Sequence, residues 1–140
     1  MDQSLKDFVA EAEDILDHLE ESVSFLMDLG PDDHRKPDVI NAIFRQAHSL
    51  KGLSGMFNLE NLTGLSHKLE NLLDSIRLDK TPLSPQAVEV LGHGTQLLVR
   101  MVRAISEGLD DDAVNISDFI RELEGLEKGI AKRDEEDLSL

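Results

Sequence analysis

The sequence predicts an all-α fold, an antiparallel four-helix bundle with an additional fifth helix at its C-terminal end. Five segments repeat apolar residues at spacings of three and four, the period of an amphipathic helix, and no segment alternates as a strand does. Each apolar stripe is too narrow for a helix buried all round, so the helices are expected to pack side by side. The 140 residues fit one domain over residues 1–132, with an acidic tail or the start of a linker over 133–140, where the periodicity stops.

The expected helices cover about residues 2–29, 38–57, 59–79, 84–107 and 115–132. In the first, apolar side chains recur from Leu5 to Leu26, and Gly30 followed by Pro31 ends the helix. The second begins at Pro37, because proline suits the first helical turn.

The link between the second and third helices is tight and contains Asn58, a residue type that tolerates the left-handed backbone of such turns. Ser84 and Pro85 begin the fourth helix, and Gly108 ends it. The fifth carries its apolar stripe within residues 116–126. Spacing alone leaves open whether the first four or the last four helices form the bundle.

Composition excludes several classes of protein. A net charge of −15 disfavours nucleic acid and anionic membranes as partners, and the absence of cysteine excludes disulfides and thiolate chemistry. No apolar run approaches the roughly 18 residues of a membrane span, and no signal-peptide pattern is present, so a cytoplasmic protein is expected. Residues 35–80 carry a net charge of +2 between two acidic flanks, and phosphate chemistry is therefore expected there.

The second helix carries a histidine in an unusual setting. On a helical wheel, His48 lies about 120° from the centre of the apolar stripe, at the margin of the helix. Gly52 and Gly55 follow on the same side, and each costs about 1 kcal/mol of helix stability relative to alanine. Two such glycines indicate that something bulky must reach the imidazole. Lys51, one turn away, could neutralise an anion placed on it.

The third helix supplies partners for this histidine. If the two helices fold back on each other at residue 59, His48 stands opposite Glu70, and Lys51 opposite His67. Glu70 lies about 110° from the centre of its own apolar stripe, so it too is marginal. The sequence therefore predicts a surface cluster of these four side chains.

These residue types suit phosphoryl transfer. A neutral imidazole is a nucleophile near neutral pH, and a carboxylate on one ring nitrogen fixes the tautomer and strengthens the other nitrogen. A nearby cation neutralises phosphate, and phosphoryl transfer depends mainly on positioning and charge. The sequence has neither a nucleotide-binding glycine loop nor clustered aspartates for Mg²⁺, so ATP and Mg²⁺ must be held by another domain or protein.

The segment Ala47-His48-Ser49-Leu50-Lys51-Gly52 resembles the His-x-x-Lys-Gly signature of histidine phosphotransfer (HPt) domains. Three further segments are similar to the N-terminal phosphoacceptor domain of the CheA family of chemotaxis histidine kinases: 66–74 (SHKLENLLD), 11–16 (EAEDIL) and 41–45 (NAIFR). One departure is Phe57-Asn58-Leu59, where that family usually has glycine followed by phenylalanine. This departure concerns the turn, not the phosphoacceptor.

The resemblance implies that His48 is the phosphoacceptor, that Glu70 orients its Nδ1, and that Lys51 and His67 are auxiliary residues. It favours the first four helices as the bundle. It also implies a kinase catalytic domain as phosphate donor, response-regulator receivers as acceptors, and a monomeric domain with no cofactor or metal of its own. Such a domain is a phosphocarrier without an ATP site, within a parent chain that is a protein histidine kinase; whether the domain counts as an enzyme stays open.

Three alternatives stay open at this point. The chain could be a free-standing HPt protein of a phosphorelay, or a helical bundle that only binds partners and whose histidine is incidental. It could also bind a metal, since His67 and Glu70 lie one turn apart, although this pair occurs once and the Glu-x-x-His pattern of di-iron bundles is absent. A metal assay and a phosphorylation assay would separate these classes.

Overall fold

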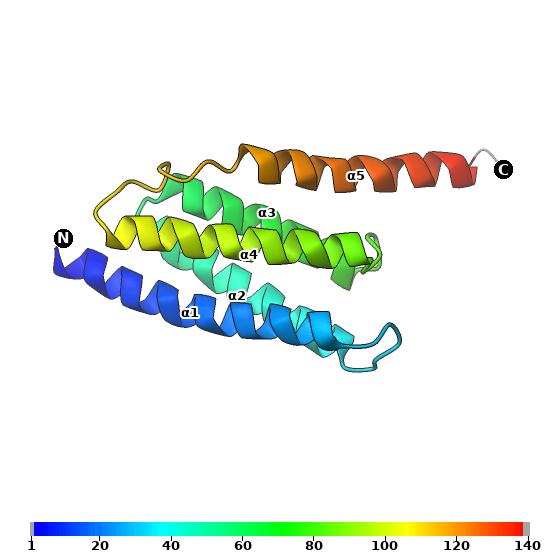
Figure 1. Ribbon diagram of the computed structural model, residues 1–140, viewed down its shortest axis with the longest axis horizontal. Helices are drawn as coiled ribbons and strands as arrows, with labels where there is room; N and C mark the ends of the chain where they lie inside the picture. The colour runs from blue at the N-terminus through cyan, green and yellow to red at the C-terminus, as the bar shows by residue number, and fades with distance from the viewer. Residues whose placement is uncertain (1, 139–140) are drawn as a thin grey trace.

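In the computed structural model, the backbone is described for residues 2–138 and the side chains for residues 2–129. The helices are α1 (Gln3–Asp28), α2 (Lys36–Met56), α3 (Glu60–Arg77), α4 (Pro85–Ser106) and α5 (Ser117–Leu138). Helices α1 to α4 form a four-membered ring in which sequence neighbours are antiparallel and α1 also contacts α4 (Figure 1). Helix α5 packs on α4. The predicted all-α bundle with a fifth helix is therefore confirmed, and its core is the first four helices.

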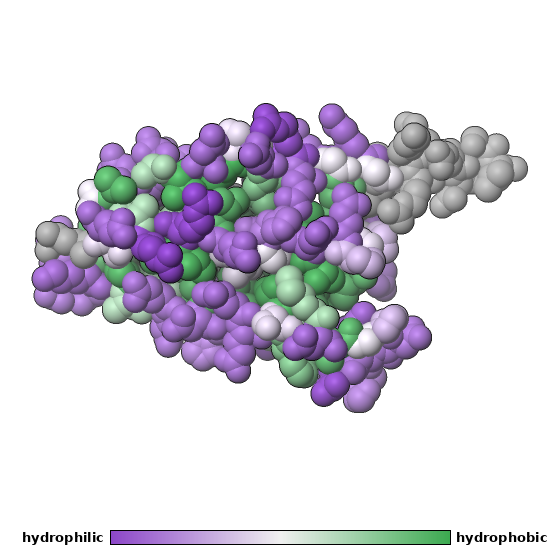
Figure 2. Space-filling view, viewed as in Figure 1, coloured by the Kyte–Doolittle hydropathy of each residue, from purple (hydrophilic) through white to green (hydrophobic). Residues whose placement is uncertain are grey.

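The apolar stripes meet inside the ring. The largest fully buried side chains come from all four of its helices: Phe8, Leu19, Ile43, Leu50, Leu62, Leu65, Leu69, Leu73, Leu91, Leu98, Met101 and Ile105. Each stabilises the fold by about 1.5–3 kcal/mol relative to an exposed side chain. Figure 2 shows the outward helix faces as mainly hydrophilic, with hydrophobic side chains in the seams between helices. The outer faces are thus left to polar residues such as those predicted at the site.

The predicted helix boundaries differ from the structure by one or two residues, except at the end of α5, where the difference is six residues. Helix α2 begins at Lys36, two residues before the predicted start, so Pro37 lies inside its first turn. Helix α5 continues to Leu138, and the backbone of residues 133–138, predicted as a tail, is helical. The charged residues there break the apolar period, but no glycine or proline stops the helix. Whether a linker follows stays a prediction.

The turn between α2 and α3 has the predicted left-handed residue. Asn58 has a φ of 58°, and the Leu59 amide donates to the Ser54 carbonyl at 3.1 Å, which closes the end of α2. The reversal occupies only residues 57–59. This short turn therefore determines which residues of α2 and α3 lie opposite each other.

The start of α3 is capped by a residue from far along the chain. Asp111, in the connection between α4 and α5, accepts hydrogen bonds from the amides of Asn61 (2.8 Å) and Leu62 (3.0 Å). The side-chain amide of Asn61 donates to the same carboxylate at 3.1 Å. These bonds satisfy amides that have no partner within the helix.

No helix in the described part of the chain is both long and apolar enough to cross a membrane.

We expect Asn58→Ala to lower the free energy of unfolding by about 0.5–1 kcal/mol, because alanine tolerates the left-handed backbone less well than asparagine. Asn58→Gly should preserve or raise stability. Urea unfolding measures both. Asn71→Ala, the same change at an exposed helical position of α3, is the matched control and should raise stability by a few tenths of a kcal/mol. Equal effects at the two sites would contradict the role of the turn.

Candidate functional site

The packing of α2 against α3 brings His48 and Glu70 together. The Nδ1 atom of His48 lies 3.2 Å from Oε2 of Glu70. The two residues are 22 positions apart, and the short turn at residues 57–59 places them at the same height. The pairing predicted from the hairpin register is therefore present.

Lys51 contacts the same carboxylate, a contact that the hairpin register did not predict. Its Nζ atom is 2.8 Å from Oε2 and 3.1 Å from Oε1 of Glu70. Helical side chains lean toward the N-terminus of their helix, so Lys51 reaches back to the height of His48. His67 is exposed and forms no hydrogen bond or ion pair within the described residues. Its auxiliary role stays a prediction.

The three side chains differ in how far they are exposed to solvent. The exposed fraction is 14% for Glu70, 26% for Lys51 and 62% for His48. Partial burial by itself raises the pKa of Glu70, but the hydrogen bonds from Lys51 and then His48 outweigh it and lower the pKa below its ordinary value. Glu70 is thus a fixed anion beneath the imidazole at neutral pH.

This geometry determines which nitrogen of His48 can react. An ionised carboxylate can only accept, so Nδ1 must carry the proton that it donates to Glu70. The lone pair is then on Nε2, which takes part in none of the described hydrogen bonds. A carboxylate at Nδ1 also makes Nε2 more basic. The arrangement can therefore present an oriented nucleophile to solvent.

The flank of α2 beyond His48 is open. Gly52 and Gly55 are both exposed, and a Cβ built on either one has no neighbour within 4 Å. No packing inside the described part of the chain therefore requires glycine there, although glycine weakens the helix. The predicted role of the two glycines in access is compatible with this open flank and stays a prediction.

The structure contains a second histidine–carboxylate pair, formed by His93 of α4, which the sequence analysis did not predict. Its Nδ1 atom lies 2.8 and 2.9 Å from the carboxylate oxygens of Glu122, on α5. No short turn links α4 to α5, so spacing gave no signal for this pair. The residues three and four positions after His93 are Gln96 and Leu97. His93 therefore lacks the lysine and the glycine that follow His48.

The aromatic ring of Phe44 was also missed. It lies 6.2 Å from the imidazole of His48 between centroids, with an angle of 13° between the planes. The four-residue spacing on one helix was the signal that could have found it.

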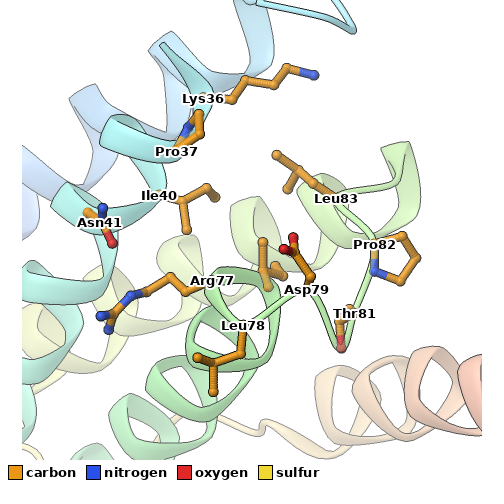
Figure 3. A pocket seen from close by; sticks show the side chains of 11 residues that line it. Lys36, Pro37, Ile40, Asn41, Arg77, Leu78, Asp79, Thr81, Pro82 and Leu83 are labelled. Atoms are coloured by element: carbon orange, nitrogen blue, oxygen red, sulfur yellow. The ribbon is translucent and has the colours of Figure 1, made fainter. Parts of the chain in front are cut away.

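The main hollow among the described residues lies away from the imidazole. This hollow, of about 610 Å³, lies farther along the α2–α3 pair, lined by the start of α2 and by residues 76–83, and His48 is not among its lining residues (Figure 3). Among the described side chains, no three His, Asp or Glu residues converge as metal ligands. The metal-binding alternative therefore has no donor set in that part of the chain.

Comparison with known families agrees with this geometry. A family model described as "Hpt domain" matches residues 3–128. The chain belongs to the Hpt domain family. The chemotaxis protein CheA of Rhizobium meliloti (strain 1021) is 33% identical to this Hpt domain over 122 residues, which are 87% of the chain and 16% of that relative. The chemotaxis protein CheA of Cereibacter sphaeroides is 30% identical over 142 residues, which cover 99% of the chain and 21% of that relative. The Hpt domain thus spans a small part of the length of these relatives.

Solved structures show the same fold. The phosphorylated P1 domain of CheA3 from R. sphaeroides, in complex with CheY6, matches with a TM-score of 0.74 and 22% identity over 94% of this chain and 98% of that chain. The solution structure of the histidine phosphotransfer domain of CheA matches with a TM-score of 0.72 and 30% identity over 89% of this chain and 91% of that chain. The resemblance predicted from the sequence is confirmed.

We expect Glu70→Gln to lower the stability of this Hpt domain by about 0.5–1 kcal/mol at pH 7. Because the pKa of Glu70 is lower in the folded state, its carboxylate stabilises the fold above the unfolded-state pKa. This contribution is lost as the pH falls below the ordinary value of 4.5 and through the folded-state pKa. Urea unfolding from pH 7 to pH 3 should therefore show the wild type and the variant converging in acid.

Glu124→Gln is the matched control, since it removes the same charge from an exposed position of α5. This variant should follow the wild type at every pH. A constant difference between Glu70→Gln and the wild type across the range would mean that the carboxylate charge is not what stabilises the site.

Proposed function

We propose that His48 of this Hpt domain accepts the γ-phosphoryl group of ATP on Nε2 and passes it to an aspartate of a response-regulator receiver. The observation that carries the proposal is the His48–Glu70–Lys51 cluster, with Nδ1 of the histidine 3.2 Å from Glu70 and Nε2 left without a described partner. It lies on the Hpt fold, in the segment that carries the His-x-x-Lys-Gly signature.

The reaction needs few groups from this chain. The Nε2 lone pair forms a bond to the γ-phosphorus while the bond from that phosphorus to the bridging oxygen breaks, and ADP leaves. Glu70 stabilises the positive charge that grows on the ring, an interaction stronger in the transition state than before it. Lys51 offsets the negative charge of Glu70, which would otherwise repel the incoming phosphate. In the second step the phosphorus–nitrogen bond breaks and an aspartate oxygen takes the phosphoryl group.

The partners follow from what this chain lacks and from its relatives. ATP and Mg²⁺ would be held by a separate kinase catalytic domain, since the sequence has no motif for either. The CheA3 P1 domain of the same fold was solved phosphorylated and bound to CheY6, which supports a receiver as the second partner here. The relatives are several times longer than this chain, which supports a place within a CheA-like histidine kinase.

His48→Gln is expected to abolish phosphorylation, because glutamine has the size but not the nucleophilic nitrogen. The measurement incubates the chain with radiolabelled ATP and the catalytic domain of a CheA kinase, and then tests the label for the acid lability and base stability of phosphohistidine. His93→Gln is the matched control and should keep the wild-type rate, since His93 has a carboxylate partner but no neighbouring lysine. Label that persists in His48→Gln would place the phosphoacceptor elsewhere.

Gly52→Leu is expected to raise helix stability by about 0.5–1 kcal/mol and yet to slow phosphorylation about tenfold or more, because the added side chain projects one turn from His48. Thermal unfolding and the rate of label transfer measure the two effects. Gly125→Leu adds the same side chain to an open position on α5 and should change stability without changing the rate. A wild-type rate in Gly52→Leu would show that the glycine provides no clearance.

A further inference from the structure

The side chains of Arg77, Phe44 and His48 form a column in which each contacts the next. The Phe44 ring and the His48 imidazole are nearly parallel, at 13°, with centroids 6.2 Å apart. The guanidinium carbon of Arg77 lies 4.1 Å from the centroid of the Phe44 ring. Both distances are within the range of favourable aromatic and cation–π contacts.

Each member of the column is held by the bundle. Phe44 precedes His48 by one turn of α2 and is partly buried against the core. Arg77 is the last residue of α3, and its Nη1 atom lies 3.5 Å from Asp74. Figure 3 shows the Arg77 side chain extending from α3 toward α2, beside Asn41. The column therefore joins the same two helices as the His48–Glu70 pair.

A single hydrogen bond cannot fix an imidazole. The bond from Nδ1 to Glu70 holds one edge of the ring but allows the ring to rotate about that bond, and the side chain is 62% exposed. Such rotation would change the direction of the Nε2 lone pair. A parallel aromatic ring restricts this rotation, because turning the imidazole would lose the stacked contact. The direction of attack matters, since small misplacements of a reacting group cost large factors in rate.

We infer that Phe44 is a positioning residue for His48, and that Arg77 holds Phe44 in place by covering its ring. The inference rests on the proposed function, because a preferred direction of Nε2 matters only if that nitrogen reacts. Phe44 acts with Glu70: the carboxylate fixes the tautomer, and the aromatic ring fixes the plane of the imidazole. The planar guanidinium of Arg77 suits the outer position, because it covers an aromatic face better than a lysine ammonium does.

The test uses phosphoramidate, a small phosphate donor that makes protein docking irrelevant. The Nε2 atom of His48 forms a bond to phosphorus, the phosphorus–nitrogen bond of phosphoramidate breaks, and ammonia leaves with its electron pair. Rates are measured over a range of donor concentrations, which separates the maximal rate from the half-saturating concentration. Mass spectrometry locates the phosphate.

We expect Phe44→Leu to lower the maximal rate between about threefold and tenfold and to leave the half-saturating concentration within about twofold. Phe44→Tyr keeps the ring and should restore the rate. Arg77→Met and Arg77→Lys should both lower the rate, since neither supplies a planar group over Phe44. Nuclear magnetic relaxation of the His48 ring should show greater mobility in Phe44→Leu, a change that a loss of stability elsewhere would not produce.

Phe25→Leu is the matched control. Phe25 of α1 also carries a cation–π contact, with the guanidinium carbon of Arg35 5.3 Å from the ring centroid, but no histidine among the described side chains is stacked on it. This variant should react at the wild-type rate. Circular dichroism verifies that each variant is folded.

The outcomes distinguish this inference from the function on which it rests. Absence of phosphate on His48 in the wild type would overturn the proposed function. If the wild type is phosphorylated on His48, and the folded Phe44→Leu variant has the same rate and the same mobility of the His48 ring, then only the positioning role of Phe44 is overturned. A wild-type rate in Arg77→Met or Arg77→Lys would overturn the inferred role of Arg77 in holding Phe44. If Phe25→Leu lowered the rate as much as Phe44→Leu, the effect would be a general one of losing an aromatic residue and not a positioning of His48.

Discussion

The turn at residues 57–59 is the constraint on which the site depends. It reverses the chain with a single left-handed residue, Asn58, so the register of α3 against α2 has little freedom. A shift of one residue in α3 would turn its side chains by about 100° and move them about 1.5 Å along the axis. Glu70 would then leave Nδ1 of His48, and the imidazole would lose the contact that fixes its tautomer.

Charge at the site is arranged as a partly buried anion, Glu70, with two donors, His48 and Lys51. The carboxylate of Glu70 alone would strengthen the imidazole as a nucleophile and at the same time repel a phosphate. Lys51 donates to this carboxylate at 2.8 Å, and its positive charge opposes that repulsion. The His93–Glu122 pair has the same kind of contact, but Gln96 takes the place in the sequence that Lys51 has after His48.

Reasoning from the sequence succeeded where distances along the chain are short. The helical period identified the five helices, and the break at Asn58 allowed His48 to be paired with Glu70 across 22 residues. It did not predict the contact of Lys51 with Glu70, because the height of a Cα atom does not give the direction in which a long side chain leans. It also ended α5 too early, since polar residues hide the period but do not stop a helix.

The sequence by itself determined the helices, the tight turn and the pairing of His48 with Glu70, because these depend on periodicity and on contacts across one short reversal. Only the tertiary structure decided the cap of α3 by Asp111, the contact of His93 with α5 and the stacking of Arg77 on Phe44. Each of these depends on packing angles or on long connections. The same apolar period is compatible with several packing angles between two helices, and only the side chains packed in the core select one of these angles.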